Sequence, residues 1–170
     1  MIKTPKKPKT RPIPKNLMQD GINLCKQNVT QFLDDSRLVI AQGRLNHAYI
    51  LVQLGIEELG KIVILNEATD SATTDSIEVD ASVFTSHNKK SEKAWNVLDT
   101  KYRLIFDEGN WKEGFRKSGT STHITFASHE TRLQCAFVNF DGQQWTQGCN
   151  IKENSLQNLI SHIEEKIKVI

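Results

Sequence analysis

The segment of residues 45–68 constrains the fold more than any other part of the chain. It contains no proline, and its apolar residues recur at helical spacing, which predicts one long helix. On a helical wheel, apolar side chains cover nearly the whole circumference of this helix. Because such a helix presents no wide polar face to solvent, we expect it to lie at the centre of a helical bundle.

Three charged residues, Glu57, Glu58 and Lys61, interrupt this apolar segment. The wheel places Glu58 in the middle of an apolar stripe that also contains His47, whereas Glu57 falls at a border. Lys61 lies one turn from Glu58 on the same side. Since an unpaired buried carboxylate is very costly, Glu58 is predicted to be buried and paired with a cation.

Three further helices are expected around this one, and a change to β-forming residues interrupts the helical pattern before the last of them. The turn signal Asp141-Gly142 predicts a β-hairpin in residues 132–149. The predicted fold is therefore mainly α, a bundle of about four helices with a small hairpin before the C-terminal helix. The remaining predicted helices run from residue 15 or 16 to about 40, ending before Gly43, from about 80 to 106, and from about 153 to 168.

The first fifteen residues differ in composition from the rest of the chain. They contain six basic residues, no acidic residue and all four prolines. This composition predicts a disordered tail over residues 1–15 and a single folded domain over residues 16–170. Two interpretations of the tail stay open: it keeps the protein in solution, or it contacts nucleic-acid phosphates without specificity. The candidate contacts are Lys6, Lys7, Lys9 and Arg11.

Several classes of protein are disfavoured by the remaining residues. The three cysteines, Cys25, Cys135 and Cys149, form no CxxC motif, so neither a zinc site nor a disulfide framework is predicted. The charges within residues 51–65 break the longest apolar run, and no signal peptide is expected. We therefore expect a cytoplasmic protein with no membrane segment and no cofactor.

The most promising candidate site combines Glu58 with His87 and Lys90, which are three residues apart in the segment FTSHNKKSEK. A cation there that faced Glu58 would complete the buried pair. One interpretation is a structural polar network that fixes the register of the helices. The other is a site where carboxylate, histidine and lysine converge on a phosphate or, with His47 added, on a divalent metal. His87, Lys90 and Glu58 are the catalytic candidates under that second interpretation.

At these residues the chain resembles the AbiV family of abortive infection proteins. The likeness rests on EELGK at 57–61 followed by H-x-x-K at 87–90, and it extends over about residues 17–168. It implies a HEPN-like helical bundle that dimerises and defends bacteria against phage by blocking translation. A phage-encoded protein or a translation component is the implied partner. The family residues carried over by position are Glu57, Glu58, Gly60, Lys61, His87 and Lys90.

The resemblance also raises an alternative, because many HEPN domains are metal-independent ribonucleases with an R-x4–6-H motif. Arg116 and His123 have this spacing, but they lie in a segment rich in Gly, Ser and Thr. In such an enzyme a histidine acts as general base, and Arg or Lys stabilises the phosphorane formed on tRNA, rRNA or mRNA. A third interpretation is a helical scaffold whose tail binds nucleic acid.

Overall fold

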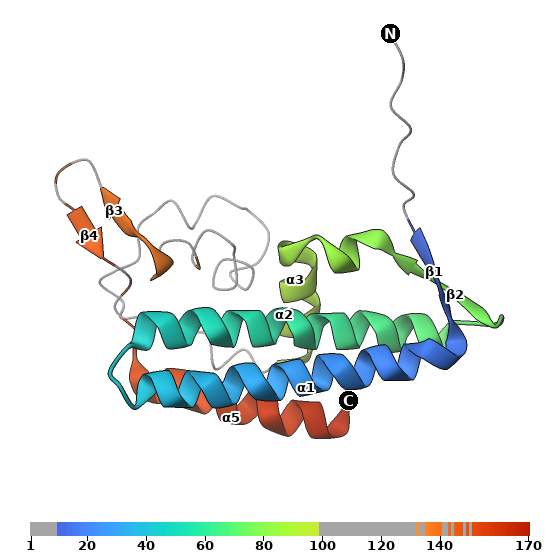
Figure 1. The fold of residues 1–170 in the computed structure, drawn as a ribbon, viewed down its shortest axis with the longest axis horizontal. Coiled ribbons are helices and arrows are strands. Elements are labelled where there is room, and N and C mark those ends of the chain that lie inside the picture. Colours follow the sequence, from blue (N-terminus) through green and yellow to red (C-terminus); the bar gives the residue numbers. More distant parts are fainter. Residues whose placement is uncertain are drawn as a thin grey trace, which may run out of the picture.

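Four α-helices make up most of the described protein. The computed structural model describes residues 10–98, 132, 135–140, 143, 145–147, 149 and 151–170. Within these residues the helices are α1 (Lys15–Ile40), α2 (Leu45–Asp70), α3 (His87–Val97) and α5 (Glu153–Val169). Helices α1, α2 and α5 lie side by side, and the shorter α3 runs across α2 (Figure 1). The prediction of a mainly α fold is confirmed.

Helices α1 and α2 form an antiparallel pair. The chain reverses after Ile40 through a turn in which Gly43 has a φ of 69°, a left-handed conformation that glycine adopts without strain. Helix α1 buries one stripe against α2, consisting of Met18, Ile22, Val29, Leu33, Ser36 and Ile40. Helix α2 is buried along most of its length. The predicted central position of α2 and the predicted end of α1 before Gly43 are therefore confirmed.

Helix α5 packs beside the α1–α2 pair and completes the apolar core (Figure 1). Leu156, Leu159, Ile160 and Ile163 are completely buried. They recur at a spacing of three or four residues, so they form one apolar stripe. At the edge of this contact, Arg37 of α1 donates two hydrogen bonds to the carboxylate of Glu164. The predicted helix over residues 153–168 is confirmed to within one residue.

A two-stranded sheet near the N-terminus was not predicted. Strand β1 (Thr10–Pro14) pairs antiparallel with β2 (Ser76–Asp80), with Ile13 opposite Ile77. Both strands of such a sheet are edge strands, where proline is tolerated. Burial of Ile77 and Val79 against the helices stabilises the pairing. Residues 10–14 are therefore part of the folded domain, in contrast to the predicted tail, whose other members Lys6, Lys7 and Lys9 lie outside the described residues.

A second antiparallel pair lies before the last helix. Strand β3 (Val138–Phe140) pairs with β4 (Trp145–Gln147), with Val138 opposite Gln147. These strands stand away from the helices beside the start of α2 (Figure 1). The prediction of a single hairpin before the C-terminal helix is therefore incomplete, since the longer strands β1 and β2 pair at the opposite end of α2.

The predicted third helix is wrong at its start. Asp80 ends β2, and its side chain accepts a hydrogen bond from the Ser82 backbone at 2.8 Å, which begins the 3-10 helix Ala81–Phe84. Helix α3 starts only at His87, where the Ser86 side chain accepts a hydrogen bond from the Lys89 N–H. Serine favours this capping position because it satisfies an otherwise unpaired N–H group. His87 is therefore the first residue of a helix.

Among the described residues, no helix combines the length and the apolar character needed to cross a membrane.

Candidate functional site

Helices α2 and α3 touch backbone to backbone at Gly60. A Cβ added to Gly60 would lie 1.8 Å from the carbonyl oxygen of Lys90 and 2.5 Å from its carbonyl carbon. Backbone atoms cannot yield to such a contact as the end of a flexible side chain can, so this approach requires glycine. Gly60 thereby fixes the first turn of α3, with His87 and Lys90, against α2.

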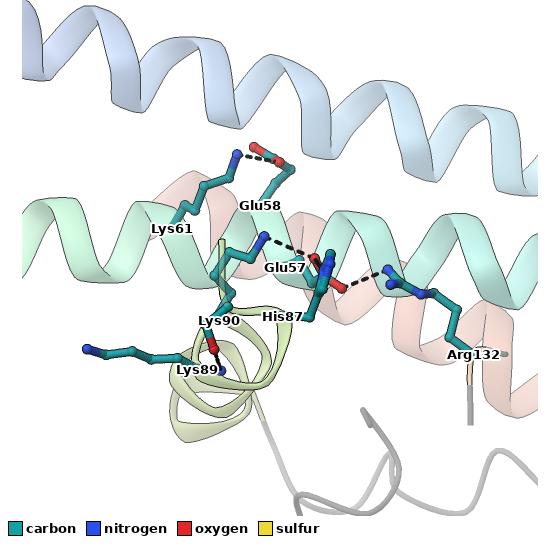
Figure 2. A network of polar contacts seen from close by, with 8 residues as sticks. Glu57, Glu58, Lys61, His87, Lys89, Lys90 and Arg132 are labelled. Carbon is teal, nitrogen blue, oxygen red and sulfur yellow. Dashed lines mark hydrogen bonds and ion pairs between the residues drawn. The ribbon is translucent and has the colours of Figure 1, made fainter. Parts of the chain in front are cut away.

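One turn before Gly60, Glu57 is the centre of a network that we call the Glu57 cluster: Glu57, His87, Lys90 and Arg132 (Figure 2). Its Oε2 lies 2.6 Å from His87 Nδ1 and 3.1 Å from Lys90 Nζ. Its Oε1 accepts a hydrogen bond of 2.8 Å from Arg132 Nη1. The cluster therefore joins α2, α3 and the segment that precedes β3.

The charges of the Glu57 cluster are largely withdrawn from water. Glu57 is 7% exposed and Lys90 is 6% exposed. Burial raises the pKa of the Glu57 carboxyl, but hydrogen bonds from His87 and Lys90 and the charges of Lys90 and Arg132 outweigh it, so the pKa is lowered. Glu57 is therefore ionised at neutral pH and balances buried cations that would be costly to leave alone.

The roles predicted for the two neighbouring glutamates are exchanged. Glu58 does pair with Lys61, at 2.5 Å, as expected, but both side chains are partly buried and point toward α1 (Figure 2). The prediction that Glu58 is the buried residue facing His87 or Lys90 is wrong, because Glu57 takes that place. When a helix is apolar nearly all round, its helical wheel cannot show which part of its circumference a neighbouring segment covers. The wheel therefore could not decide which of the two glutamates faces α3.

The surroundings of Cys25 on α1 agree with this orientation of Glu58. Burial, followed by the nearby negative charge of Glu58, raises the pKa of the Cys25 thiol to about 11. Cys25 is therefore a protonated, partly buried thiol at the contact between α1 and α2.

The structure does not assemble the metal site that was considered from Glu58, His47 and His87. His47 is exposed near the start of α2, whereas His87 contacts Glu57. Within the part of the chain that the structure describes, no group of three His, Cys, Asp or Glu residues could hold a metal ion.

Arg132 is the member of the Glu57 cluster that sequence reasoning missed. It is 75 residues from Glu57 in the chain, so no local pattern connects the two. A buried carboxylate needs cations nearby, and this rule is the only sequence signal that indicates a further basic partner such as Arg132. A second contact docks the same region on α2, because Asn46 Oδ1 accepts a hydrogen bond of 2.7 Å from the Cys149 N–H.

The remaining predicted residues are separate from the Glu57 cluster. Arg11 lies in β1, and its guanidinium is 5.2 Å from the centre of the Phe84 ring. That contact holds Arg11 against the folded domain as a cation–π pair. Arg116 and His123 lie outside the described residues, so their predicted pairing is neither supported nor contradicted.

The chain matches the HEPN_AbiV family model, described as AbiV, over residues 17–168. No curated protein and no solved structure matches the chain. The matched range contains α2, α3, most of α1 and α5, and every residue of the Glu57 cluster. Because the match covers most of the sequence, this chain belongs to the AbiV family of HEPN domains, an abortive infection family whose membership implies antiphage defence.

Proposed function

We propose that this protein acts in the cytoplasm of an infected bacterium and stops phage propagation by blocking translation. It does so by binding a phage-encoded protein or a component of the translation machinery. Family membership supports the defence role. The binding mechanism rests on one observation, an exposed apolar surface on the β3–β4 pair.

This surface, which we call the hairpin patch, consists of Phe137, Val138 and Trp145. Their exposed fractions are 60%, 58% and 73%. Single exposed apolar residues are common, but Val138 in β3, Trp145 in β4 and Phe137 directly before β3 give one short β pair three exposed apolar residues, which is a feature of interaction sites. Buried aromatic anchors supply much of the energy of protein interfaces, and tryptophan is among the most enriched. The hairpin patch therefore suits a protein partner.

The test is Trp145→Ala, with Val169→Ala as the matched control. Val169 is also exposed and apolar, but it lies near the C-terminal end of α5, far from the strands (Figure 1). We expect Trp145→Ala to abolish protection against phage in a plating assay and inhibition of translation in a cell extract, without a change in thermal stability. Val169→Ala should retain both activities. Full protection by Trp145→Ala would contradict the proposed surface.

A ribonuclease is the second candidate, and the contact between Glu57 and His87 favours it. Glu57 holds His87 through Nδ1, while the His87 side chain is 45% exposed. A carboxylate in this position holds an imidazole in one orientation and one tautomer, as a general base acting on a ribose 2′-OH requires. Lys90 is buried and fixes Glu57, and Glu58 points toward α1, so this proposal gives the catalytic role to His87.

Purified protein incubated with total RNA in EDTA separates the two candidates. Cleavage that His87→Ala abolishes would support the ribonuclease and remove the purely binding mechanism. The matched control is Lys89→Ala, since Lys89 lies on the same turn of α3 but contacts Asp80, outside the Glu57 cluster. Intact RNA in an extract where translation is blocked would support binding.

We also propose a homodimer, which the family resemblance implies. Leu17, Leu24 and Leu38 are exposed on α1, and their separations of seven and fourteen residues place them on one face of the helix. Leu24→Glu should then give a monomer in sedimentation analysis. A dimer that persists in Leu24→Glu would contradict an interface on this face of α1.

A further inference from the structure

Two thiols meet at the base of the β3–β4 pair. Cys135 precedes β3 and Cys149 follows β4, and their sulfur atoms are 2.7 Å apart, with Cys135 donating to Cys149. Both are free cysteines in the structure. Cys135 is buried, whereas Cys149 is partly exposed. A pair in contact with unequal exposure is the arrangement in which one thiol reacts first and the other completes a crosslink.

We propose that Cys135 and Cys149 are a redox-sensitive pair that closes to an intramolecular disulfide when the surrounding low-molecular-weight thiols become oxidised. Neither the AbiV match nor the proposed function assigns a role to these thiols. Disulfides in reducing compartments are transient and report a change in redox state. The crosslink is therefore a regulated modification of the hairpin rather than a permanent support of the fold.

The chemistry is an exchange with a small disulfide such as oxidised glutathione. The Cys149 thiolate attacks one glutathione sulfur, the glutathione S–S bond breaks, and one glutathione thiolate leaves. Cys135 then attacks the Cys149 sulfur of this mixed disulfide and expels the second glutathione, with its thiol proton going to solvent or to the leaving group. Two protein thiols are oxidised to one disulfide, and one glutathione disulfide is reduced to two thiols.

The hydrogen bond between the two cysteines supports this order of attack. It lowers the pKa of the Cys149 thiol, although burial opposes the effect, and together with burial it raises the pKa of the Cys135 thiol. The more exposed sulfur is therefore also the one that more readily becomes the nucleophilic thiolate.

The position of the pair determines what the crosslink would restrain. Arg132, which hydrogen-bonds Glu57, lies three residues before Cys135, and the Cys149 N–H is bonded to Asn46. Both ends of the crosslink therefore lie beside contacts with α2. Oxidation would join Cys135 to Cys149 and so oppose separation of the hairpin base from the helices. The residues of the hairpin patch lie between the two cysteines in the chain.

The experiment exposes the full chain to glutathione buffers of increasing oxidation, traps free thiols by alkylation and maps the cysteines by mass spectrometry. We expect the wild type to lose two hydrogen atoms and two alkylation sites, with Cys135 joined to Cys149. Cys25→Ser is the matched control and should give the same crosslink. Cys135→Ser should instead accumulate one glutathione on Cys149, and Cys149→Ser should form no intramolecular disulfide.

A crosslink involving Cys25, or a wild type that keeps glutathione on Cys149 without closing the pair, would overturn the proposal. Because Cys135 is buried, circular dichroism must show that each variant is folded, and Cys149→Ala provides a second variant at the more exposed position. Hydrogen exchange gives an independent readout: the Cys149 amide should exchange several-fold more slowly in the oxidised protein. An unchanged rate would contradict the proposed restraint on the hairpin base.

Discussion

Glu57 and Glu58 are neighbours in the chain and have opposite surroundings. Glu57 contacts side chains from α3 and from the segment before β3, whereas Glu58 pairs with Lys61 one turn further along its own helix. Successive residues of a helix point about 100° apart, so each belongs to a different interface. Glu57 therefore holds three parts of the fold together, whereas the ion pair of Glu58 joins two residues of α2 only. Substitutions on the two sides of α2 test this difference.

The largest effect is expected for Glu57→Ala. Its removal would leave Lys90 and Arg132 without their shared carboxylate, and breaking a buried charge pair costs about 3–5 kcal/mol. The free energy of unfolding in urea measures this loss. A cost below about 1 kcal/mol would mean that the cluster is solvated and does not hold the segments together.

The next effect is expected for Gly60→Ala, where a Cβ would meet the Lys90 backbone. Helix α3 would have to move away, and overpacking of this kind costs about 1–3 kcal/mol. Gly55→Ala is the matched control on the same helix, because a Cβ there meets its nearest atom, a side-chain carbon of Leu33, at 3.6 Å. Alanine at position 55 should therefore leave stability unchanged or raise it by up to about 1 kcal/mol. Equal losses of stability at positions 55 and 60 would contradict the close approach of α3 to Gly60.

A smaller effect is expected for Glu58→Ala. Its partner Lys61 comes from the same helix, and both side chains retain some contact with water, so the loss should be about 1 kcal/mol. The same urea titration applies. A cost as large as that of Glu57→Ala would remove the distinction between the two glutamates.

The smallest effect concerns pH. The folded-state pKa of Glu57 lies below its ordinary value of 4.5, so its contribution to stability is fully present above that pH. As the pH falls below 4.5 toward the folded-state pKa, the carboxylate takes up a proton and the contribution is lost. Glu57→Gln should therefore show a weaker fall in stability over this acidic range than the wild type. Parallel curves for the two proteins would assign the acid sensitivity to other carboxyl groups.

Local patterns were sufficient to predict α1, α2 and α5. The stripe of Leu156, Leu159 and Ile163, for example, is set by helix geometry and needs no knowledge of distant residues. The pairing of Ile13 with Ile77 could not be predicted in this way, because it joins distant parts of the chain. Long-range pairing depends on which surfaces the completed fold brings together.

The candidate site divides along the same line. The family resemblance selected six residues, of which Glu57, Gly60, His87 and Lys90 meet in one contact region. The other two, Glu58 and Lys61, pair with each other on the side of α2 that faces α1 (Figure 2). The wheel alone ranked Glu58 above Glu57, because it contains no information about α3 or Arg132. A buried charge identifies the need for a partner, but only the packing of the segments identifies that partner.

Helix α2 holds Lys90 at two points one turn apart. The Lys90 backbone packs against Gly60, and the Lys90 ammonium group forms an ion pair with Glu57. Sliding α3 along α2 would drive its backbone into the side chains on either side of the glycine, and turning α3 about its own axis would carry Nζ away from the carboxylate. Helix α3 therefore has no small movement available that keeps one contact and relaxes the other. Any partner that displaces α3 has to break the steric fit and the ion pair together, so we expect α3 to be either docked or released, with no stable position between.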